Sequence, residues 1–353
     1  MKKYEYPEVG ETLFREVLPN GLTLLVLPRP GFTKHLAYFV TDFGSIHTDF
    51  SLDGREIHAP AGIAHFLEHK MFDLPGRDVT EEFAALGAIP NAFTSYGMTA
   101  YYFSCTENFE AALRLLIEFV STPYFTEESV QKEMGIIDQE IGMNADTPDS
   151  QVFEGLMEAM YREHQIRVPI LGTSETIRQI TPEILHDCHR AFYTPGNMIL
   201  CVIGDVDPDR IRDIAEEMLG SEARSVGQKL RPWNEDMAMN ADRFHRQMEV
   251  AMPMFHIAFK AEPVGTGEHA IRQEIVADLA AEALFGESSQ LYLKLYEDGL
   301  IDSSFGGGFE TIDGMAMLLC SGDSDDAEGV RSAILDQAQK SSGRVSRRRI
   351  SCG

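Results

Sequence analysis

The sequence predicts an α+β protein built from two similar domains, each with a mostly antiparallel sheet packed against helices. Short apolar stretches of strand length alternate along the chain with longer stretches that are amphipathic at helical period. The chain has 353 residues, more than a single compact core usually organises, and 44% of them are hydrophobic. The second half also repeats patterns of the first. We therefore expect two separate cores.

The first elements of the chain are expected to be strands. An Asn-Gly pair separates two apolar runs in residues 14–28, which is typical of a β-hairpin. A further strand is expected in 35–44, followed by a polar loop. Two strands are expected in 88–97 and 99–106, and an apolar one in 197–206.

Helices are expected between and after these strands. The stretch 78–87 ends at Gly87, a typical residue just beyond a helix C-terminus. The stretch 126–144 begins at Thr126, which is a good N-cap and has Ser129 three places on. Other stretches have apolar residues at helical period, namely 62–72, 107–120, 150–164, 181–193 and 207–219.

A stretch without apolar period predicts a linker at residues 221–245. It separates an expected first domain, residues 1–220, from a second, residues 246–353. In the second, "GLIDSSF" at 299–305 resembles "GAIPNAF" at 87–93.

The second copy is expected to be incomplete at its C-terminus. When the second copy is aligned with the first, the end of the chain falls at a point inside the first domain, which continues well beyond it. The tail at 339–353 is also basic and poor in apolar residues. At the matching offset, Asp278 and Glu282 stand where the first half has His65 and His69. The second copy therefore has no histidine pair at these positions.

Charge and cysteine content exclude several classes of protein. A net charge of −26 argues against nucleic acid and anionic membranes as partners. No apolar run approaches the roughly 18 residues that a membrane span needs, and "MKKYEYPEVG" lacks the apolar core of a signal peptide. The five cysteines lie far apart without a CxxC spacing, which favours reduced thiols. A cytoplasmic protein is expected.

The stretch "GIAHFLEHKMF" at 62–72 combines apolar residues with two histidines and a glutamate. His65 and His69 are four positions apart, so on a helix both imidazoles lie on one face. Glu68 is one step from the second histidine. A bound metal would satisfy these buried polar groups. The alternative is a pair of core histidines that hydrogen-bond to the backbone or to Glu68.

The helix predicted at 126–144 offers a third ligand. Glu133 and Glu140 are seven residues apart, which is close to two helical turns, so they share one face. This spacing does not choose between them, and two solvated surface carboxylates are the alternative. Two imidazoles and one carboxylate, with a fourth position for water, form the ligand set of a catalytic zinc site.

The motif and its surroundings resemble the pitrilysin/insulinase family of inverzincin zinc metallopeptidases, in particular its bacterial processing-peptidase-like group. The sequence His65-x-x-Glu68-His69 is the inverted zincin motif. The stretches "NAFTSYGMTAYYF", "EMGIIDQEI", "PILGTSETIRQIT" and "FYTPGNMILCVIGDVD" follow in the order typical of that family, so that the resemblance covers about residues 12–220.

The resemblance implies a zinc-dependent endopeptidase that cleaves peptides or unfolded segments inside a two-domain chamber. It implies Zn²⁺ as cofactor and Glu68 as the general base. It also implies roles for further residues: His65, His69 and Glu140 as zinc ligands, Glu133 as a carboxylate that assists catalysis by orienting a histidine, and Asn91, Ala92 and Phe93 as a strand that pairs with the substrate backbone.

The same resemblance bears on partners. Besides a peptide substrate, it implies a homodimer or a heterodimer with a metal-free relative. Two alternatives to a self-sufficient enzyme stay open at this point. One is a subunit that only helps to form the chamber, and the other is a truncated zinc-binding form that needs a partner for activity.

Overall fold

The computed structural model describes residues 1–231, 234–312 and 314–350, the last ten of them by their backbone alone. The chain divides into two compact units. Unit 1 comprises Met1–Gly142 and Val168–Trp233, and unit 2 comprises Met143–Arg167 and Asn234–Gly353. Each unit combines strands and helices, which confirms the predicted fold class. Among the described residues, no helix is both long and apolar enough to span a membrane.

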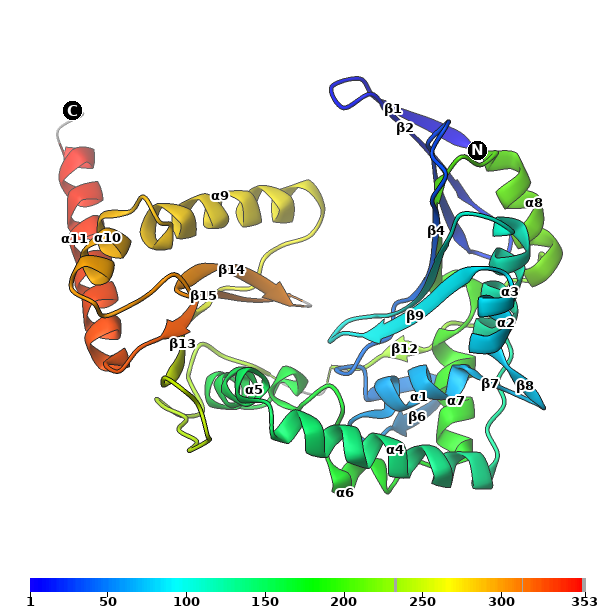
Figure 1. The fold of residues 1–353 in the computed structure, drawn as a ribbon, viewed down its shortest axis with the longest axis horizontal. Helices are drawn as coiled ribbons and strands as arrows, with labels where there is room; N and C mark the ends of the chain where they lie inside the picture. Colours follow the sequence, from blue (N-terminus) through cyan, green and yellow to red (C-terminus); the bar gives the residue numbers. More distant parts are fainter. Residues whose placement is uncertain (232–233, 313, 351–353) are drawn as a thin grey trace. The chain divides into compact units, whose positions relative to one another are not determined.

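Unit 1 is organised around a seven-stranded sheet with the order β1-β2-β3-β11-β4-β10-β9 (Figure 1). The parallel pair is β3 with β11, and the other neighbours are antiparallel. The strands are β1 (Lys2–Tyr6), β2 (Glu11–Val17), β3 (Thr23–Pro28), β4 (His35–Thr41), β9 (Ala88–Thr94), β10 (Thr99–Cys105) and β11 (Met198–Gly204).

The strands predicted in unit 1 are confirmed. The β2–β3 hairpin turns at Asn20 and Gly21, where the Asn20 side chain accepts a hydrogen bond from the backbone of Leu22 and Gly21 has a φ of 93°. β4, β9, β10 and β11 lie in the other predicted stretches. β9 is the last strand of the sheet, so one of its edges has no partner strand among the described residues.

The helices of unit 1 also follow the predicted stretches, apart from the short helix at Ser174–Ile177, which lies in none of them. Thr126 and Ser129 bond reciprocally at the start of α4, as expected of an N-cap. α3 and α8 contact each other and the sheet, and α7 contacts α1. The helices are α1 (Ile63–Met71), α2 (Val79–Ala85), α3 (Phe109–Ser121), α4 (Glu127–Ala145), α6 (Ser174–Ile177), α7 (Pro182–Phe192) and α8 (Pro208–Leu219).

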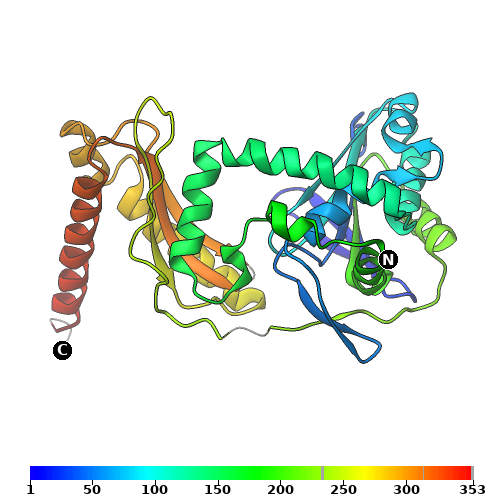
Figure 2. The ribbon, with the colours of Figure 1, turned by 90° about the horizontal axis from the view of Figure 1, so that it is seen from below.

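The polar loop expected after β4 contains a hairpin that the sequence did not reveal. β5 (Asp49–Leu52) pairs with β6 (Arg55–His58), and β12 (Gln228–Lys229), from the predicted linker, pairs with β5 (Figure 2). A short pair, β7 (Asp73–Leu74) and β8 (Arg77–Asp78), follows α1. These strands are too short for a periodic apolar signal to identify them.

Unit 2 has a three-stranded antiparallel sheet with the order β13-β15-β14. α5 contacts β13 and α9 contacts β14, and the two helices lie on opposite sides of the strands. The elements are α5 (Pro148–Met160), β13 (Met254–Ala261), α9 (Gly267–Phe285), α10 (Gln290–Glu297), β14 (Gly306–Ile312), β15 (Met315–Asp323) and α11 (Ala327–Ile350).

The two units share an arrangement of elements. The order β13-β15-β14 with α9 on β14 matches β4-β10-β9 with α1 on β9. The proposed match of 299–305 with 87–93 is wrong in detail, because 87–93 contains most of β9 whereas 299–305 precedes β14. In this stretch Ile301 and Phe305 are buried in the core of unit 2, so its apolar residues fill a core from a turn instead of forming a strand.

Two segments lie in a different unit from the one that local sequence signals suggest. α5 and residues 234–245 belong to unit 2, although the sequence placed the helix in the first domain and the other segment in a linker. Long-range contacts decide this, since the Glu235 carboxylate accepts hydrogen bonds from the backbone after α5. The backbone of α11 extends through 339–350 of the basic tail, and residues 351–353, including Cys352, lie outside the described residues.

Candidate metal centre

The helix α1 presents both histidines of the motif on one face. It begins after Gly62, which has a φ of 89° and lies so close to Leu171 that a Cβ would approach the Leu171 oxygen to 2.5 Å. Only glycine fits such a contact with such a φ. The close approach fixes where α1 starts, and the rings of His65 and His69 then lie one turn apart, with centroids separated by 4.6 Å.

The helix α4 brings both candidate carboxylates to this face of α1. Glu133 and Glu140 lie two turns apart, and Ile137 between them is fully buried, which anchors that side of the helix in the core. Elsewhere on α4, Asp138 accepts a short hydrogen bond from the Ser174 hydroxyl at the start of α6. These contacts hold α4 in place beside α1.

Three side chains converge in a geometry that fits a zinc ion. His65 Nε2 lies 3.6 Å from Glu140 Oε1, and His69 Nε2 lies 3.4 Å from Glu140 Oε2. Ligands about 2.0–2.1 Å from a tetrahedral ion lie roughly 3.3 Å from one another. Within the described part of the chain, this is the one group of three His, Cys, Asp or Glu side chains whose ligand atoms all lie within 4.8 Å.

Glu133 lies on the other side of the second imidazole. Its Oε1 is 3.0 Å from His69 Nδ1, so a proton on Nδ1 leaves Nε2 free to face Glu140. A carboxylate in this position fixes the tautomer and orientation of a metal-binding histidine. The two acidic residues, equivalent by spacing alone, therefore occupy different places around His69.

The two imidazoles differ in their electrostatic surroundings. Burial, and to a smaller extent the nearby His69, lowers the pKa of His65 to about 4, so this imidazole is neutral near pH 7. Burial also lowers the pKa of His69, but the carboxylates of Glu133, Glu140 and Glu68 outweigh this and raise it overall. A neutral, buried His65 has a lone pair ready for a metal.

Glu68 lies beside the histidines in a mostly buried position. Burial raises the pKa of its carboxyl group, while a hydrogen bond from the Thr94 hydroxyl and the charge of His69 oppose the rise. The hydrogen bond joins Thr94 Oγ1 to Glu68 Oε2 at 2.6 Å. A raised pKa is typical of carboxylates that exchange protons during a reaction.

A cavity of about 420 Å³ opens beside these residues. Asn91 and Ala92 of β9 line it, whereas the ring of Phe93 lies against Tyr102, with centroids 6.4 Å apart. Pairing of these residues with a peptide backbone stays a prediction. The lining is Glu68, His69, Phe72, Asp73, Thr80, Pro90, Asn91, Ala92 and Glu133.

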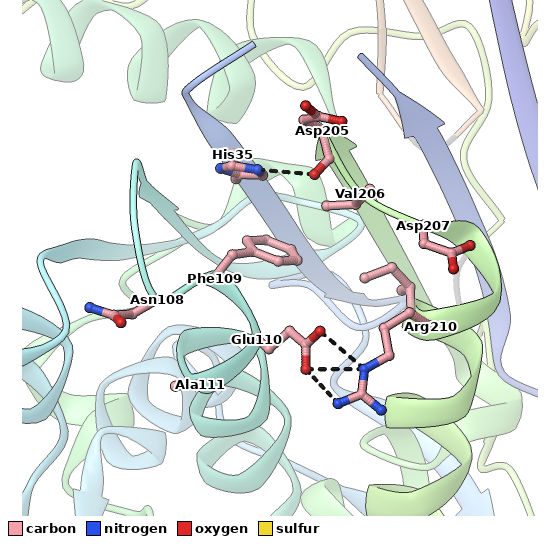
Figure 3. Close-up of a pocket in the computed structure, with 10 residues that line it drawn as sticks. His35, Asn108, Phe109, Glu110, Ala111, Asp205, Val206, Asp207 and Arg210 are labelled. Atoms are coloured by element: carbon pink, nitrogen blue, oxygen red, sulfur yellow. Dashed lines mark hydrogen bonds and ion pairs between the residues drawn. The ribbon is translucent and has the colours of Figure 1, made fainter. Parts of the chain in front are cut away.

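A second cavity, of about 490 Å³, has a different character (Figure 3). The Arg210 guanidinium pairs with Glu110 at 2.5 Å, and His35 Nε2 lies 3.3 Å from the backbone oxygen of Asp205. Because these polar groups already bond to one another, the cavity has no set of converging ligands like that around His65.

The sequence did not reveal Thr94, nor three residues that line the cavity, Phe72, Asp73 and Thr80. Thr94 could have been found, because side chains two residues apart on a strand face the same side. Ala92 lines the cavity, so Thr94 shares its face. Phe72, Asp73 and Thr80 carry no comparable local signal.

Comparison with known protein families identifies both parts of the chain. Residues 55–174 match the family described as Insulinase (Peptidase family M16). Residues 179–346 match the family described as Peptidase M16 inactive domain. The first match contains the three converging side chains, and within the described residues the second contains no comparable group.

Curated relatives carry protease names. An uncharacterized zinc protease of Bacillus subtilis, YmfH, is 40% identical over 346 residues, which cover 95% of this chain and 80% of the relative. An uncharacterized zinc protease of Rickettsia felis is 33% identical over 209 residues, covering 58% of this chain and 49% of the relative.

Solved structures show the same fold. The crystal structure of an M16-like peptidase from Alicyclobacillus acidocaldarius has a TM-score of 0.90 at 34% identity and covers 96% of this chain and 79% of the other. A protease from Helicobacter pylori has a TM-score of 0.75 at 19% identity, which is a likeness of fold. With a relative that is 40% identical along most of both chains, this chain belongs to the M16, or insulinase, family of peptidases.

Proposed function

We propose that this protein is a zinc-dependent endopeptidase that cleaves peptides or unfolded segments. The observation that carries the proposal is the convergence of His65 Nε2, His69 Nε2 and a Glu140 carboxylate at distances that suit one zinc ion. Three protein ligands with room for a water are the arrangement of catalytic zinc sites, whereas structural sites have four.

In this proposal His65, His69 and Glu140 hold the metal, and Glu133 keeps Nδ1 of His69 protonated so that Nε2 binds. Zinc bound there would polarise the scissile carbonyl and lower the pKa of a bound water to about 7. The Glu68 carboxylate would accept a proton from the attacking water. Its burial favours this task, because a desolvated carboxylate is a stronger base than a solvated one.

The substrate is inferred to bind as an extended strand along β9. One edge of β9 has no partner strand among the described residues and offers backbone groups to an added strand, and β9 borders the cavity that Glu68 lines. Asn91 and Ala92 would lie nearest the scissile bond, with Phe93 beside them. Recognition through backbone groups suits unfolded peptides, because most backbone groups of a folded substrate are already paired within its own structure.

The test is hydrolysis of a mixed pool of internally quenched peptides by protein of known zinc content. Wild type should hold about one zinc per chain, cleave the pool, lose activity to a chelator and regain it with zinc. Glu68→Gln should keep the zinc and lose about 10²- to 10⁴-fold in rate, since it removes the proton acceptor with little change of shape.

The matched control is Glu128→Gln, which makes the same change on the exposed first turn of α4. It should behave as wild type. Cleavage by Glu68→Gln near the wild-type rate would rule out the role given to Glu68. A wild type that holds zinc but cleaves nothing would instead favour the alternative, a zinc-binding chain that needs a partner for activity.

A further inference from the structure

The hydrogen bond between Thr94 and Glu68 links the candidate base to the strand inferred to bind the substrate. Thr94 is the last residue of β9, and its hydroxyl donates to Glu68 Oε2 at 2.6 Å. Glu68 itself is on α1. A carboxylate has two oxygens, and this bond engages one of them while it constrains the rotation of the group.

The position of Thr94 is fixed by the turn that follows it. Thr94 pairs with Thr99 across the β9–β10 hairpin, and Ser95 N donates to the backbone oxygen of Met98 at 2.8 Å. The turn is also bonded to the loop after β4, because Ser95 and Tyr96 accept hydrogen bonds from the backbone of residues 45 and 46 at 3.0 and 3.1 Å.

The loop after β4 approaches the turn so closely that a side chain would not fit. A Cβ on Gly44 would lie 2.4 Å from the Tyr96 oxygen and 2.5 Å from the Met98 nitrogen. The fully buried Thr99 hydroxyl donates to the backbone oxygen of Phe43 at 2.8 Å, a second tie between the hairpin and this loop. The end of β9 is therefore rigid, and so is the point from which Thr94 reaches Glu68.

We propose that Thr94 is a positioning residue, whose hydroxyl holds Oε2 of Glu68 and leaves Oε1 directed at the water to be deprotonated. This inference rests on the proposed function, in which Glu68 is the base. A donor that fixes the carboxylate before the reaction begins removes the need to orient it in the transition state. Loss of the donor should therefore slow the chemical step and leave peptide binding intact.

The alternative is that the Thr94 hydroxyl only stabilises the end of the strand. Thr94→Val and Thr94→Ser separate the two roles. Valine keeps the shape and removes the donor, whereas serine keeps the donor. Positioning predicts that Thr94→Val loses about 10- to 100-fold in kcat, as expected when a hydrogen bond to a charged group is lost, with KM and zinc content unchanged. Thr94→Ser should recover most of the rate.

The control is Thr106→Val, the same change at an exposed threonine after β10, which should leave kcat and KM unaltered. Crystal structures of zinc-loaded wild type and Thr94→Val give a readout that does not depend on activity. The Glu68 carboxylate should turn away from its wild-type orientation in the valine variant. An unchanged carboxylate, or a Thr94→Val enzyme with the wild-type kcat, would overturn the inference.

The two readouts keep this inference separate from the proposed function. A wild type without peptidase activity would defeat the function, and the orientation of Glu68 in the zinc-loaded valine variant would still decide whether Thr94 positions it. A lower melting temperature with kcat and carboxylate unchanged would assign Thr94 a structural role only.

Discussion

At the scale of single residues, the candidate site depends on how two similar glutamates are placed. Glu133 and Glu140 share a face of α4, yet one contacts His69 at Nδ1 and the other approaches both imidazoles at Nε2. The helical period explains the shared face. Where α1 crosses α4 decides which carboxylate could bind a metal together with the imidazoles, because all the ligand atoms must lie within bonding distance of the same point.

The zinc content of single variants tests this assignment. His65→Ala and Glu140→Ala should each lose most of the bound metal, because a site with two protein ligands holds zinc weakly. Glu133→Ala should keep a site with zinc affinity reduced roughly 10- to 100-fold, as is typical when a partner of a ligating histidine is removed. Zinc can be measured by mass spectrometry after dialysis against a graded chelator, with Glu128→Ala as the control.

The opposite pattern would reverse the assignment. If Glu133→Ala abolished zinc binding and Glu140→Ala preserved it, then Glu133 would be the ligand. Circular dichroism of each variant should be recorded alongside, so that a loss of metal is not confused with a loss of fold.

At the scale of secondary structure, a buried ion pair joins Glu235, in the segment that follows Trp233, to Lys260 on β13. The same glutamate also bonds to the backbone just after α5. The side chains of Glu235 and Lys260 are 3% and 5% exposed, and Lys260 Nζ lies 2.5 Å from Glu235 Oε1. The same carboxylate accepts hydrogen bonds from the backbone of residues 162–164, just beyond α5. Replacing one partner of such a buried pair strongly lowers the free energy of unfolding, because the other charge is left buried without a partner.

The pH dependence of stability should reveal this pair. Burial alone would raise the pKa of Glu235, but Lys260 and the backbone donors outweigh it and lower the value to about 2, against 4.5 for a free glutamate. The unfolded state therefore takes up the proton first. The stabilisation is fully present above about pH 4.5 and is lost as the pH falls toward 2.

This lowering of the Glu235 pKa corresponds to a contribution on the order of 3 kcal/mol to the free energy of unfolding at pH 7. Glu235→Gln should be less stable than wild type by about that amount at pH 7, and the difference should shrink below pH 4.5. Calorimetric unfolding from pH 7 to pH 3 measures this difference in stability. The control is Glu249→Gln, the same change at an exposed position. A difference that stays constant with pH would contradict the role given to Glu235.

At the scale of the whole chain, the described side chains of the candidate site all lie in unit 1. The three candidate ligands, Glu68 and Thr94 come from α1, α4 and β9, and none of them from unit 2. Residues 221–226 are exposed and have no helix or strand, so we propose that the chain can be divided there or shortly after.

A fragment of residues 1–231 tests this division. We expect it to fold and bind about one zinc, because it contains the whole seven-stranded sheet and every candidate ligand. It should melt at a lower temperature than the full chain, since α5 loses its contact with β13. Zinc content and circular dichroism measure both, with His65→Ala in the same fragment as the control. A fragment that is unfolded or unable to bind zinc would show that unit 2 is needed for the fold of unit 1.

The sequence by itself determined the features that local physics controls. Most of the longer strands and helices of unit 1 followed from apolar period, from the Asn20–Gly21 turn and from the Thr126 cap, each of which acts over a few neighbouring residues. The motif also brought His65, Glu68 and His69 together within one helix, because four residues make about one turn.

Tertiary structure decided the features that depend on contacts between distant segments. The place of α5 in unit 2 follows from its contacts with Glu235 and β13, which lie more than 70 residues further along the chain. The different positions of Glu133 and Glu140 follow from where α4 meets α1, and the bond from Thr94 to Glu68 joins a strand to a helix 26 residues away. Periodicity reports which face a side chain shares with its neighbours, but which partner meets that face depends on how the whole chain packs.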